Sequence, residues 1–327
     1  MNNNGGRDGA ALFAAAGATL CYGATPVFIK YFTGYLDAWT VNGLRYSVGA
    51  LFWLPFVILV SRKGHCGTEI PNGYDGIRPV AGIWKAALIP AAINCAGQVG
   101  WGLTPYYLDA TVIGFVYKLH FLFTILCGFA LIRAERPLAR DPWFWAGTVV
   151  CIAGVVLMFA RNLGASGSSS ATGMALLIAA TALFGAYAVA VKQCVGAYPA
   201  RLSFGVISLY TAAGLVTLMF LVGDFGRIST LQPRTWGFIV VSALIGIAFA
   251  HVLYYRAIQG LGAVISTGLM MATPFVTLLG AALFLGEKTT PLQLAGGLAV
   301  VAGGVMLAVS NSRLGRAAAA QLPASDT

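Results

Sequence analysis

The sequence predicts an all-α membrane protein with ten transmembrane helices in two inverted repeats of five helices each. Three observations support this fold class. The chain of 327 residues is 58% hydrophobic and only 9% charged, with a mean hydropathy of +0.81, whereas soluble domains carry about 25% charged residues. Apolar runs of spanning length recur along the chain. Finally, motifs of the first half reappear in the second.

A spanning helix needs about 20 mostly apolar residues. The first apolar run is long enough, and no small-residue cleavage site follows it, so we expect a retained helix rather than a cleaved signal peptide. The predicted spans are 10–32, 38–60, 85–105, 110–132, 142–160, 173–195, 202–223, 235–256, 261–285 and 290–310.

The distribution of Lys and Arg predicts the orientation. One side of the membrane, which holds both termini and the even-to-odd loops, receives thirteen of the 20 basic residues. The other side receives five, and the remaining two, Arg45 and Lys118, fall inside spans. Cytoplasmic loops carry the excess of basic residues. We therefore expect a multi-pass protein of the cell inner (cytoplasmic) membrane with both termini in the cytoplasm.

Two sequence echoes predict the repeats. The segment Tyr22–Lys30 (YGATPVFIK) recurs as Phe184–Lys192 (FGAYAVAVK), and AGTVVCIAGVVLM at 146–158 matches GGLAVVAGGVMLA at 296–308. Because five is odd, the second half enters the membrane from the opposite side, an arrangement typical of secondary transporters. The predicted organisation is a first repeat at 10–160, a Ser/Gly-rich linker at 161–172, a second repeat at 173–311 and a disordered cytoplasmic tail at 312–327.

These residues resemble a known repeat. The segment YGATPVFIK, Arg45 in the second span and above all MMATPFVTLLGAALFLGEKTTPLQLAGGLAVVAGGVM are similar to the EamA-type repeat of the drug/metabolite transporter superfamily. Pro274, Glu287 and the glycine-rich last span fall where that family has them. The resemblance covers nearly the whole chain, and the aromatic and neutral amino-acid exporters are one candidate branch. It implies ten helices, cytoplasmic termini and alternating access that moves small metabolites, often outward.

The first half departs from that pattern at one place. Where the second repeat reads Met270-Met-Ala272, the first reads Lys118-Leu-His120, and Leu122 replaces the proline that the second repeat has at Pro274. The resemblance therefore does not assign a substrate.

Several function classes lack their sequence signatures. The net charge of +10 comes from basic residues scattered between apolar runs, which does not predict a nucleic-acid partner. The sequence contains no HExxH, GxSxG or P-loop motif and no Cys/His cluster for a metal. We expect a transporter rather than an enzyme, with no cofactor and no metal; a membrane-embedded enzyme or sensor is the less favoured alternative.

Lys118 is the first candidate for the substrate site. A charge near the bilayer centre costs about 2.5–3.5 kcal/mol on insertion scales, and such residues usually face the bundle interior. All ten acidic residues lie in loops, tails or helix ends, so no acid is expected inside a span. Lys118 can lose its proton, occupy a wet cavity or bind an anionic substrate. The structural alternative is an ammonium capped by backbone carbonyls and water.

Two histidines are candidates for proton coupling, because histidine titrates near neutrality. His120 lies about 200° around an ideal helix from Lys118, so we expect it to pack against a neighbouring helix rather than to share the cavity with Lys118. His251 is expected near the membrane interface.

Other polar and aromatic residues complete the candidate site. Arg45 can snorkel outward or bind a substrate carboxylate through two hydrogen bonds. The third span carries Asn94, Gln98 and Trp101 on one helical face, either lining a cavity or joining helices. The remaining candidates are Tyr22 and Tyr187.

The sequence thus predicts a transporter, and export is the favoured direction, for a small carboxylate-bearing or amino-acid-like solute. The cavity is expected to be lined by spans 1, 3, 4, 6, 8 and 9, with the solute and the lipid bilayer as partners. Efflux of amphipathic drugs or other metabolites is the alternative. The oligomeric state is not predicted.

Overall fold

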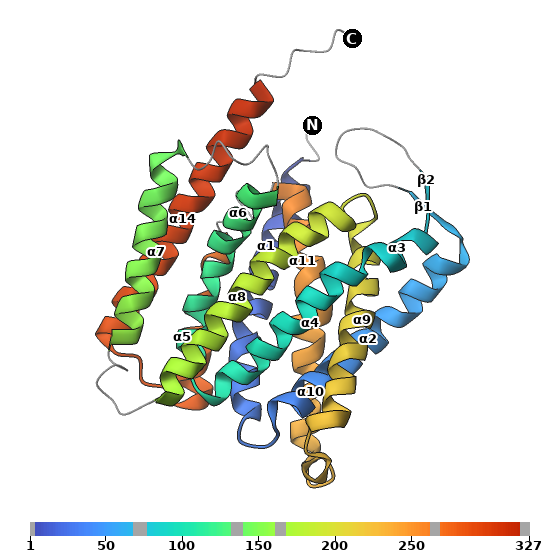
Figure 1. Cartoon of the computed structure of the whole chain (residues 1–327), viewed down its shortest axis with the longest axis horizontal. Helices are drawn as coiled ribbons and strands as arrows, with labels where there is room; N and C mark the ends of the chain where they lie inside the picture. Colours follow the sequence, from blue (N-terminus) through green and yellow to red (C-terminus); the bar gives the residue numbers. More distant parts are fainter. Residues whose placement is uncertain (1–3, 68–76, 132–139, 161–167, 262–268, 321–327) are drawn as a thin grey trace.

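A computed structural model describes residues 4–67, 77–131, 140–160, 168–261 and 269–320. The chain forms one bundle of helices with a small β-hairpin at one end (Figure 1). The elements of the first half are α1 (Asn4–Phe32), α2 (Ala38–Arg62), β1 (His65–Gly67), β2 (Ile77–Pro79), α3 (Ala81–Ala86), α4 (Leu88–Leu103), η1 (Thr104–Tyr106), α5 (Ala110–Val116), η2 (Tyr117–Leu119), α6 (His120–Leu131) and α7 (Pro142–Ala160).

The second half has the same order of helices. Its elements are α8 (Ser168–Cys194), α9 (Ala200–Val222), η5 (Phe225–Arg227), α10 (Pro233–Ala243), η6 (Leu244–Phe249), α11 (Ala250–Leu261), α13 (Thr273–Gly280), η7 (Ala281–Leu285) and α14 (Pro291–Ala320). The predicted all-α membrane fold is confirmed, and a helix stands at each of the ten predicted spans; residues 262–268 of the ninth lie outside the described residues.

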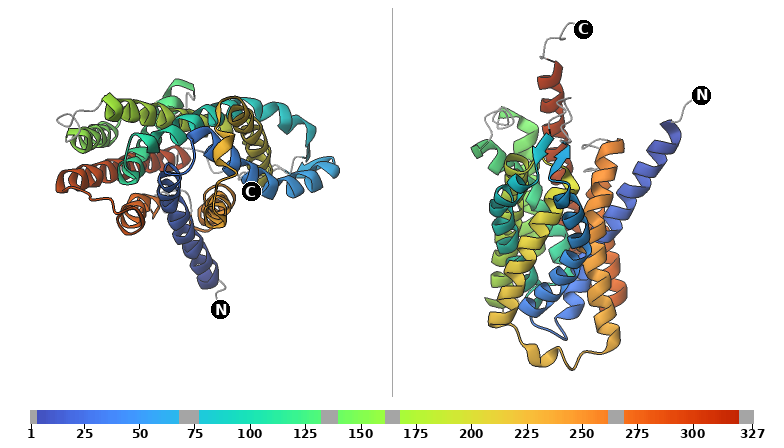
Figure 2. Two further views of the ribbon diagram at one scale, coloured as in Figure 1. Left: turned by 90° about the horizontal axis from the view of Figure 1, so that it is seen from below. Right: turned by 90° about the vertical axis from the view of Figure 1, so that its right-hand side faces the viewer.

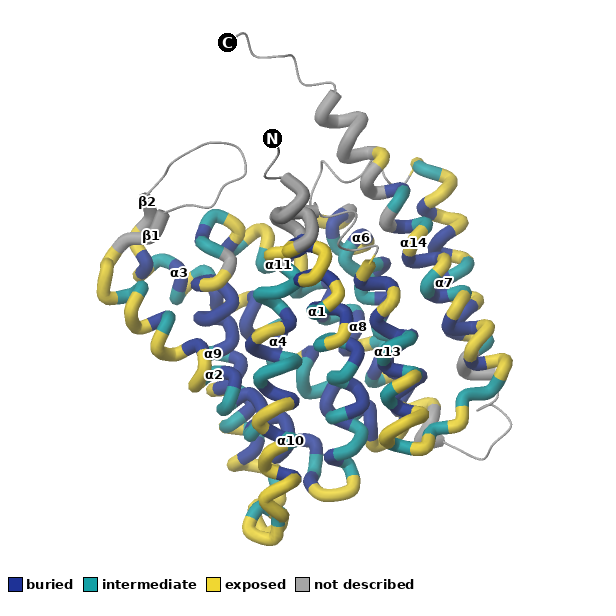
Figure 3. The backbone as a smooth tube through the Cα atoms, turned by 180° about the vertical axis from the view of Figure 1, so that it is seen from behind, coloured by how far each residue is buried: buried dark blue, intermediate teal, exposed yellow. Residues whose placement is uncertain are grey.

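Length and composition agree with a membrane location for this bundle. Among the described residues, six helices are long and apolar enough to cross a membrane, and three shorter apolar helices accompany them. The outer face carries large exposed apolar side chains, such as Leu283 at 78% and Phe284 at 80% exposure. Figure 3 shows buried positions on the inner faces of the helices and exposed positions on their outer faces. Lipid can cover such a surface, whereas water would penalise it.

The packing of the helices has the symmetry expected of inverted repeats. Helix α1 packs against α11 and α13, and its counterpart α8 packs against α4 and α6. The second helices of the halves, α2 and α9, pair with each other, and so do the last helices, α7 and α14. Exchanging the two halves therefore turns each of these helix contacts into another contact of the same set. The start of α1 and the end of α14 lie at the same end of the bundle (Figure 1).

The pairing of α7 with α14 depends on small residues. A Cβ atom on Gly147 would lie 2.9 Å from the Gly303 carbonyl oxygen, and one on Gly303 would lie 2.6 Å from that of Gly147. The two backbones can approach this closely only because neither position has a side chain. In Figure 2 the N-terminal part of α1 leans away from the bundle, whereas α7 and α14 stay side by side.

Charged side chains tie the loops together at the end of the bundle where α5 begins. Lys30 Nζ donates to the carbonyl oxygens of Pro105 (2.7 Å) and Leu108 (2.9 Å). Glu287 accepts hydrogen bonds from the Ala110 amide at 2.7 Å and from the Thr111 amide and hydroxyl at 3.1 and 2.9 Å. The second repeat thus supplies the carboxylate that caps the first turn of α5 in the first repeat.

Asp37 caps another helix nearby. It precedes α2, accepts from the Thr40 amide at 2.9 Å and hydroxyl at 2.6 Å, and also accepts from the Asp224 amide at 3.0 Å. This N-cap therefore joins the loop before α2 to the loop after α9.

Two sequence expectations need correction, and one element was not expected. The tail expected to be disordered from residue 312 continues α14 as far as Ala320, because the run RAAAA has a high helix propensity. The linker expected at 161–172 is shorter, since α8 begins at Ser168, and serine is favoured where helices start. The long second loop contains an antiparallel hairpin, with His65 opposite Pro79, that hydropathy did not predict. Residues 161–167 and 321–327 lie outside the described residues.

Candidate functional site

A cavity of about 430 Å³ lies between the two halves. Its wall comes from α1, α2, α4, the continuous α5–η2–α6 segment, α8, the η6–α11 segment and the start of α13. The second span therefore joins the six spans that were expected to line it. The structure places all nine sequence-predicted side chains on this wall: Tyr22, Arg45, Asn94, Gln98, Trp101, Lys118, His120, Tyr187 and His251.

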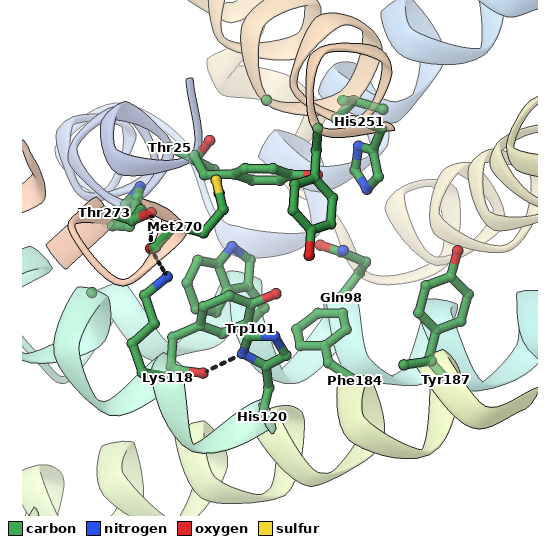
Figure 4. A pocket seen from close by; sticks show the side chains of 18 of the residues that line it. Thr25, Gln98, Trp101, Lys118, His120, Phe184, Tyr187, His251, Met270 and Thr273 are labelled. Atoms are coloured by element: carbon green, nitrogen blue, oxygen red, sulfur yellow. Dashed lines mark hydrogen bonds between the residues drawn. The ribbon is translucent and has the colours of Figure 1, made fainter. Parts of the chain in front are cut away.

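The side chain of Lys118, which lies in the fourth span, reaches a break in the helix of the ninth span. Its side chain is 5% exposed, and Nζ donates to the Met270 carbonyl oxygen at 2.9 Å. In a regular helix the amide of residue 274 would bind that carbonyl. Pro274 has no N–H, which leaves the carbonyl available to Lys118 and to the Thr273 hydroxyl at 2.6 Å. Lys118 thus has the backbone cap of the structural alternative and also lines the cavity (Figure 4).

His120 differs from its expected position. It lines the cavity with Lys118 instead of packing outside it. The reason is the 3-10 turn η2, in which residues advance by about 120° rather than 100°. His120 Nδ1 lies 2.9 Å from the Tyr117 carbonyl oxygen, and its ring stacks on Tyr117 with centroids 4.8 Å apart. In Figure 4 it stands on the Phe184 side of the turn, while Lys118 points to Met270 and Thr273.

Arg45 is buried, so the snorkelling alternative is wrong. Its side chain is 2% exposed; Nε donates to Ser242 Oγ at 3.0 Å and Nη2 to the Ser242 carbonyl oxygen at 3.4 Å. These bonds join α2 to the end of α10. Gly246, in the π-helical segment η6, lies beside them: a Cβ there would be 2.7 Å from Thr25 Oγ1 and 3.3 Å from Arg45 Nη2.

The polar face of α4 both lines the cavity and joins helices. Asn94 Nδ2 donates to Thr211 Oγ1 of α9 at 3.0 Å, and the Gln98 carbonyl accepts from Asn42 Nδ2 of α2 at 2.8 Å. The Trp101 ring lies 4.8 Å from that of Tyr117. Both alternatives for this face therefore apply, since the same residues join neighbouring helices and line the cavity.

His251 also differs from its expected position. Instead of lying at the interface, it stacks on Phe204 with ring centroids 4.2 Å apart and meets the Tyr22 ring at 5.4 Å. The π-helical segment η6 precedes His251 and shifts the helical phase of the residues that follow it. His251 Nδ1 is buried and has no hydrogen-bond partner among the described residues.

Sequence reasoning missed several wall residues. Tyr46 and Tyr117 are ordinary aromatic positions within apolar runs, and nothing in the pattern marked them. Phe184 had a signal, because it aligns with the candidate Tyr22 in the repeated motif. The Met270 carbonyl had a signal, because a proline four residues later removes the amide that would bind it. Gly246 had none.

The wall combines two basic side chains with an aromatic surface. Eight of its residues are Tyr, Trp or Phe, two are His, and the basic residues are Lys118 and Arg45. None of the described wall residues is Asp or Glu. Such a site suits a solute with an acidic group and an apolar body.

Comparison with known proteins places the chain in a family. The EamA-like transporter family matches residues 9–160 and 171–309. The chain belongs to the EamA-like transporter family. It is thus a multi-pass membrane protein of a transporter family and not of an enzyme family, as the sequence resemblance implied.

Individual relatives add less. The chain is 27% identical over 157 residues to the "Uncharacterized transporter YwfM" of Bacillus subtilis (strain 168), a match that spans 48% of this chain and half of the relative's length. A solved structure described as "Crystal structure of protein" has a TM-score of 0.60 at 15% identity, covering 93% of this chain and 98% of its own. At that identity the likeness concerns the fold alone.

Proposed function

We propose that the chain is a secondary transporter that moves a small carboxylate-bearing, amino-acid-like solute across the cytoplasmic membrane by alternating access. The observation that carries this proposal is the Lys118 ammonium on the wall of a cavity whose described residues include no acid. Among the described residues, the Met270 carbonyl is its hydrogen-bond partner. An ammonium has further N–H donors, which a carboxylate in the cavity can accept.

The aromatic wall supports an amino-acid-like body for the solute. Trp101, Tyr117 and Phe184 lie against one another, with ring centroids 4.8 to 6.3 Å apart. Such rings bury an apolar side chain, while the side-chain amides of Asn94 and Gln98 on the same wall can bind polar groups.

The direction and the orientation belong to the proposal as well. We propose that both termini lie in the cytoplasm, because one side of the membrane carries the excess of basic residues. Export is the proposed direction because the resemblance to the EamA-type repeat implies transport that is often outward. The sequence has no P-loop, so a solute gradient or an exchanged solute would supply the energy. The two halves, 10–160 and 173–311, would rock about the cavity between them.

Proton coupling through histidine is the mode of coupling to examine first. His120 and His251 both line the cavity. If the Tyr117 carbonyl accepts the Nδ1–H of His120, the Nε2 atom of His120 is the acceptor that can take a proton from water or solute. A pH gradient across the vesicle would then drive uptake in the wild type and not in the variant His120→Gln.

The test is counterflow of labelled solutes in liposomes that contain the purified protein. Neutral and aromatic amino acids, organic acids and amphipathic cations form the panel. We expect carboxylates to be exchanged, and we expect Lys118→Met to lower their rate by about tenfold or more, the factor expected for one lost charged hydrogen bond. Lys118→Arg should restore part of it.

The matched control is Lys85→Met, which removes an exposed lysine of α3 and should not change the rate. Equal carboxylate exchange in the wild type and in Lys118→Met would contradict the role of Lys118. Exchange of amphipathic cations without carboxylates would favour drug efflux instead.

A further inference from the structure

Arg45 brings a second positive charge to the cavity that already holds Lys118. The two side chains come from different helices, α2 and the η2 turn, and both are almost completely buried, at 2% and 5% exposure. No Asp or Glu is present among the described wall residues to neutralise either one. A monoanionic solute would therefore leave one buried cation without a counter-ion, which is costly in a medium of low dielectric constant.

The guanidinium of Arg45 is fixed by one edge only. Both hydrogen bonds that it makes to described residues go to Ser242, from Nε to Oγ and from Nη2 to the carbonyl oxygen. The Ser242 hydroxyl donates its own proton to the Ile239 carbonyl at 2.9 Å, so it presents a lone pair to Arg45. The Nη1 side of the guanidinium has no hydrogen-bond partner among the described residues, and its N–H groups are available to a ligand.

The backbone of a neighbouring helical segment approaches Arg45 closely. Gly246 lies in the π-helical segment η6 and lines the cavity. Any Cβ at this position would contact Thr25 Oγ1 at 2.7 Å and Arg45 Nη2 at 3.3 Å. Single π-helical turns recur at functional sites. This one places Gly246, which has no side chain, next to the guanidinium of Arg45.

We propose that Arg45 forms a second anion-binding subsite and that the cavity selects solutes with two carboxylates joined by an apolar body. This inference rests on the proposed function, because Lys118 binds the first carboxylate. Arg45 binds the second by its free edge, since the planar guanidinium matches a carboxylate with two parallel hydrogen bonds. The aromatic wall contacts the apolar body. The complete solute then neutralises both buried cations.

The test compares each dicarboxylate with its own monoamide, which has nearly the same size and one charge less. Purified wild-type protein in detergent is titrated with the series from succinate to suberate and the matching monoamides. Affinity is measured by thermal shift, and exchange by counterflow. We expect at least one chain length at which the dicarboxylate binds about tenfold more tightly than its monoamide, the factor expected for one charged hydrogen-bonded pair.

Variants of Arg45 identify the residue responsible. In Arg45→Gln the ratio between dicarboxylate and monoamide affinities should fall to about one, and Arg45→Lys, which keeps the charge without the fork, should give an intermediate ratio. Size-exclusion chromatography reports whether each variant is folded. If Arg45→Gln does not fold, the comparison of the ligand pairs on the wild type still decides whether a second charge is recognised.

The outcomes separate the two proposals. Equal affinity of the wild type for dicarboxylates and monoamides overturns the second subsite and leaves the Lys118 site in place. A dicarboxylate preference that persists in Arg45→Gln overturns the assignment to Arg45. Absence of binding and exchange for every carboxylate, including amino acids, overturns the proposed function itself.

Discussion

The Lys118 ammonium binds the backbone carbonyl of Met270, the residue that occupies the equivalent position in the second repeat, at 2.9 Å. Two equivalent residues can touch only close to the axis that relates the two halves. Lys118 Nζ therefore lies near this axis, and its bond crosses from one half to the other. Pro274 makes this bond possible, because proline has no N–H group that could bind the Met270 carbonyl within the helix.

Pro274→Ala tests this relationship. Alanine supplies the missing amide, so the Met270 carbonyl can bind within its own helix. We expect the unfolding temperature to change little, since proline is tolerated in the first turn of a helix, where Pro274 lies, and the exchange of solute to be several-fold slower. Thermal unfolding and counterflow measure the two effects. An unchanged rate would show that the break does not matter for transport.

Lys118→Met should separate stability from function. Methionine stands at the equivalent position of the second repeat, and replacing a buried charge by an apolar group is often neutral or stabilising. The Met270 carbonyl keeps the Thr273 hydroxyl as a donor. We therefore expect an equal or higher unfolding temperature together with lost exchange. A clear drop in unfolding temperature would mean that the lysine is needed for folding.

Gly246 and Gly237 provide a matched pair of substitutions. Gly246→Ala places a Cβ 2.7 Å from Thr25 Oγ1, and we expect a loss of about 1–3 kcal/mol in stability, together with weaker dicarboxylate binding. Gly237→Ala has nothing within 4 Å of the new atom, so the better helix propensity of alanine should stabilise α10 by up to about 1 kcal/mol. Similar losses in both variants would contradict the close packing at η6.

Two acidic side chains stand near the start of α5, and substitutions of Glu287 and Asp109 show which of them caps the helix. Glu287→Gln weakens the cap on the Ala110 and Thr111 amides, and we expect a loss of about 0.5–2 kcal/mol. Asp109 occupies the N-cap position but makes no side-chain capping bond. Asp109→Ala should therefore cost less than Glu287→Gln in thermal unfolding, and the reverse order would contradict the assignment of the cap.

Asp37 makes stability depend on pH at the acidic end. Partial burial alone would raise its pKa, but hydrogen bonds from Thr40, Asp224 and Trp39 outweigh burial and hold the pKa below its ordinary value. A lowered pKa in the folded state gives stability that is present at neutral pH and lost as the pH falls below about 4. The unfolding temperature of Asp37→Asn should fall less over this range than that of the wild type. Parallel curves would exclude Asp37 as the group responsible.

Hydropathy and the sequence echoes were enough to predict the fold class. Apolar runs of spanning length mark helices wherever lipid is the solvent, and an odd number of spans per repeat dictates inversion. Lys118 and Arg45 were found because a charge inside a span is costly. Their position on one cavity wall followed from the packing, which the sequence pattern did not contain.

The two histidines differ from their expected positions for different reasons. His120 was placed with an ideal helical period, but it follows the 3-10 turn η2. His251 was expected at the interface because it stands near the end of its predicted span, but its ring packs against Phe204 and Tyr22. A 3-10 or π turn shifts the phase of the helix and so changes which residues face inward. The composition of YKL and LIGIAF gave no sign of these turns.

The pairing of α7 with α14 joins the two halves at a place away from the cavity. These helices end the two repeats, join them directly through Gly147 and Gly303, and contribute no described residue to the cavity wall. This contact between the halves is thus separate from the cavity wall, whereas α1, α2, α4 and α8 both join the halves and line the cavity. Substitutions in the cavity can leave the α7–α14 contact intact, and a methyl group added at Gly147 or Gly303 would disturb the packing of the halves whatever the solute.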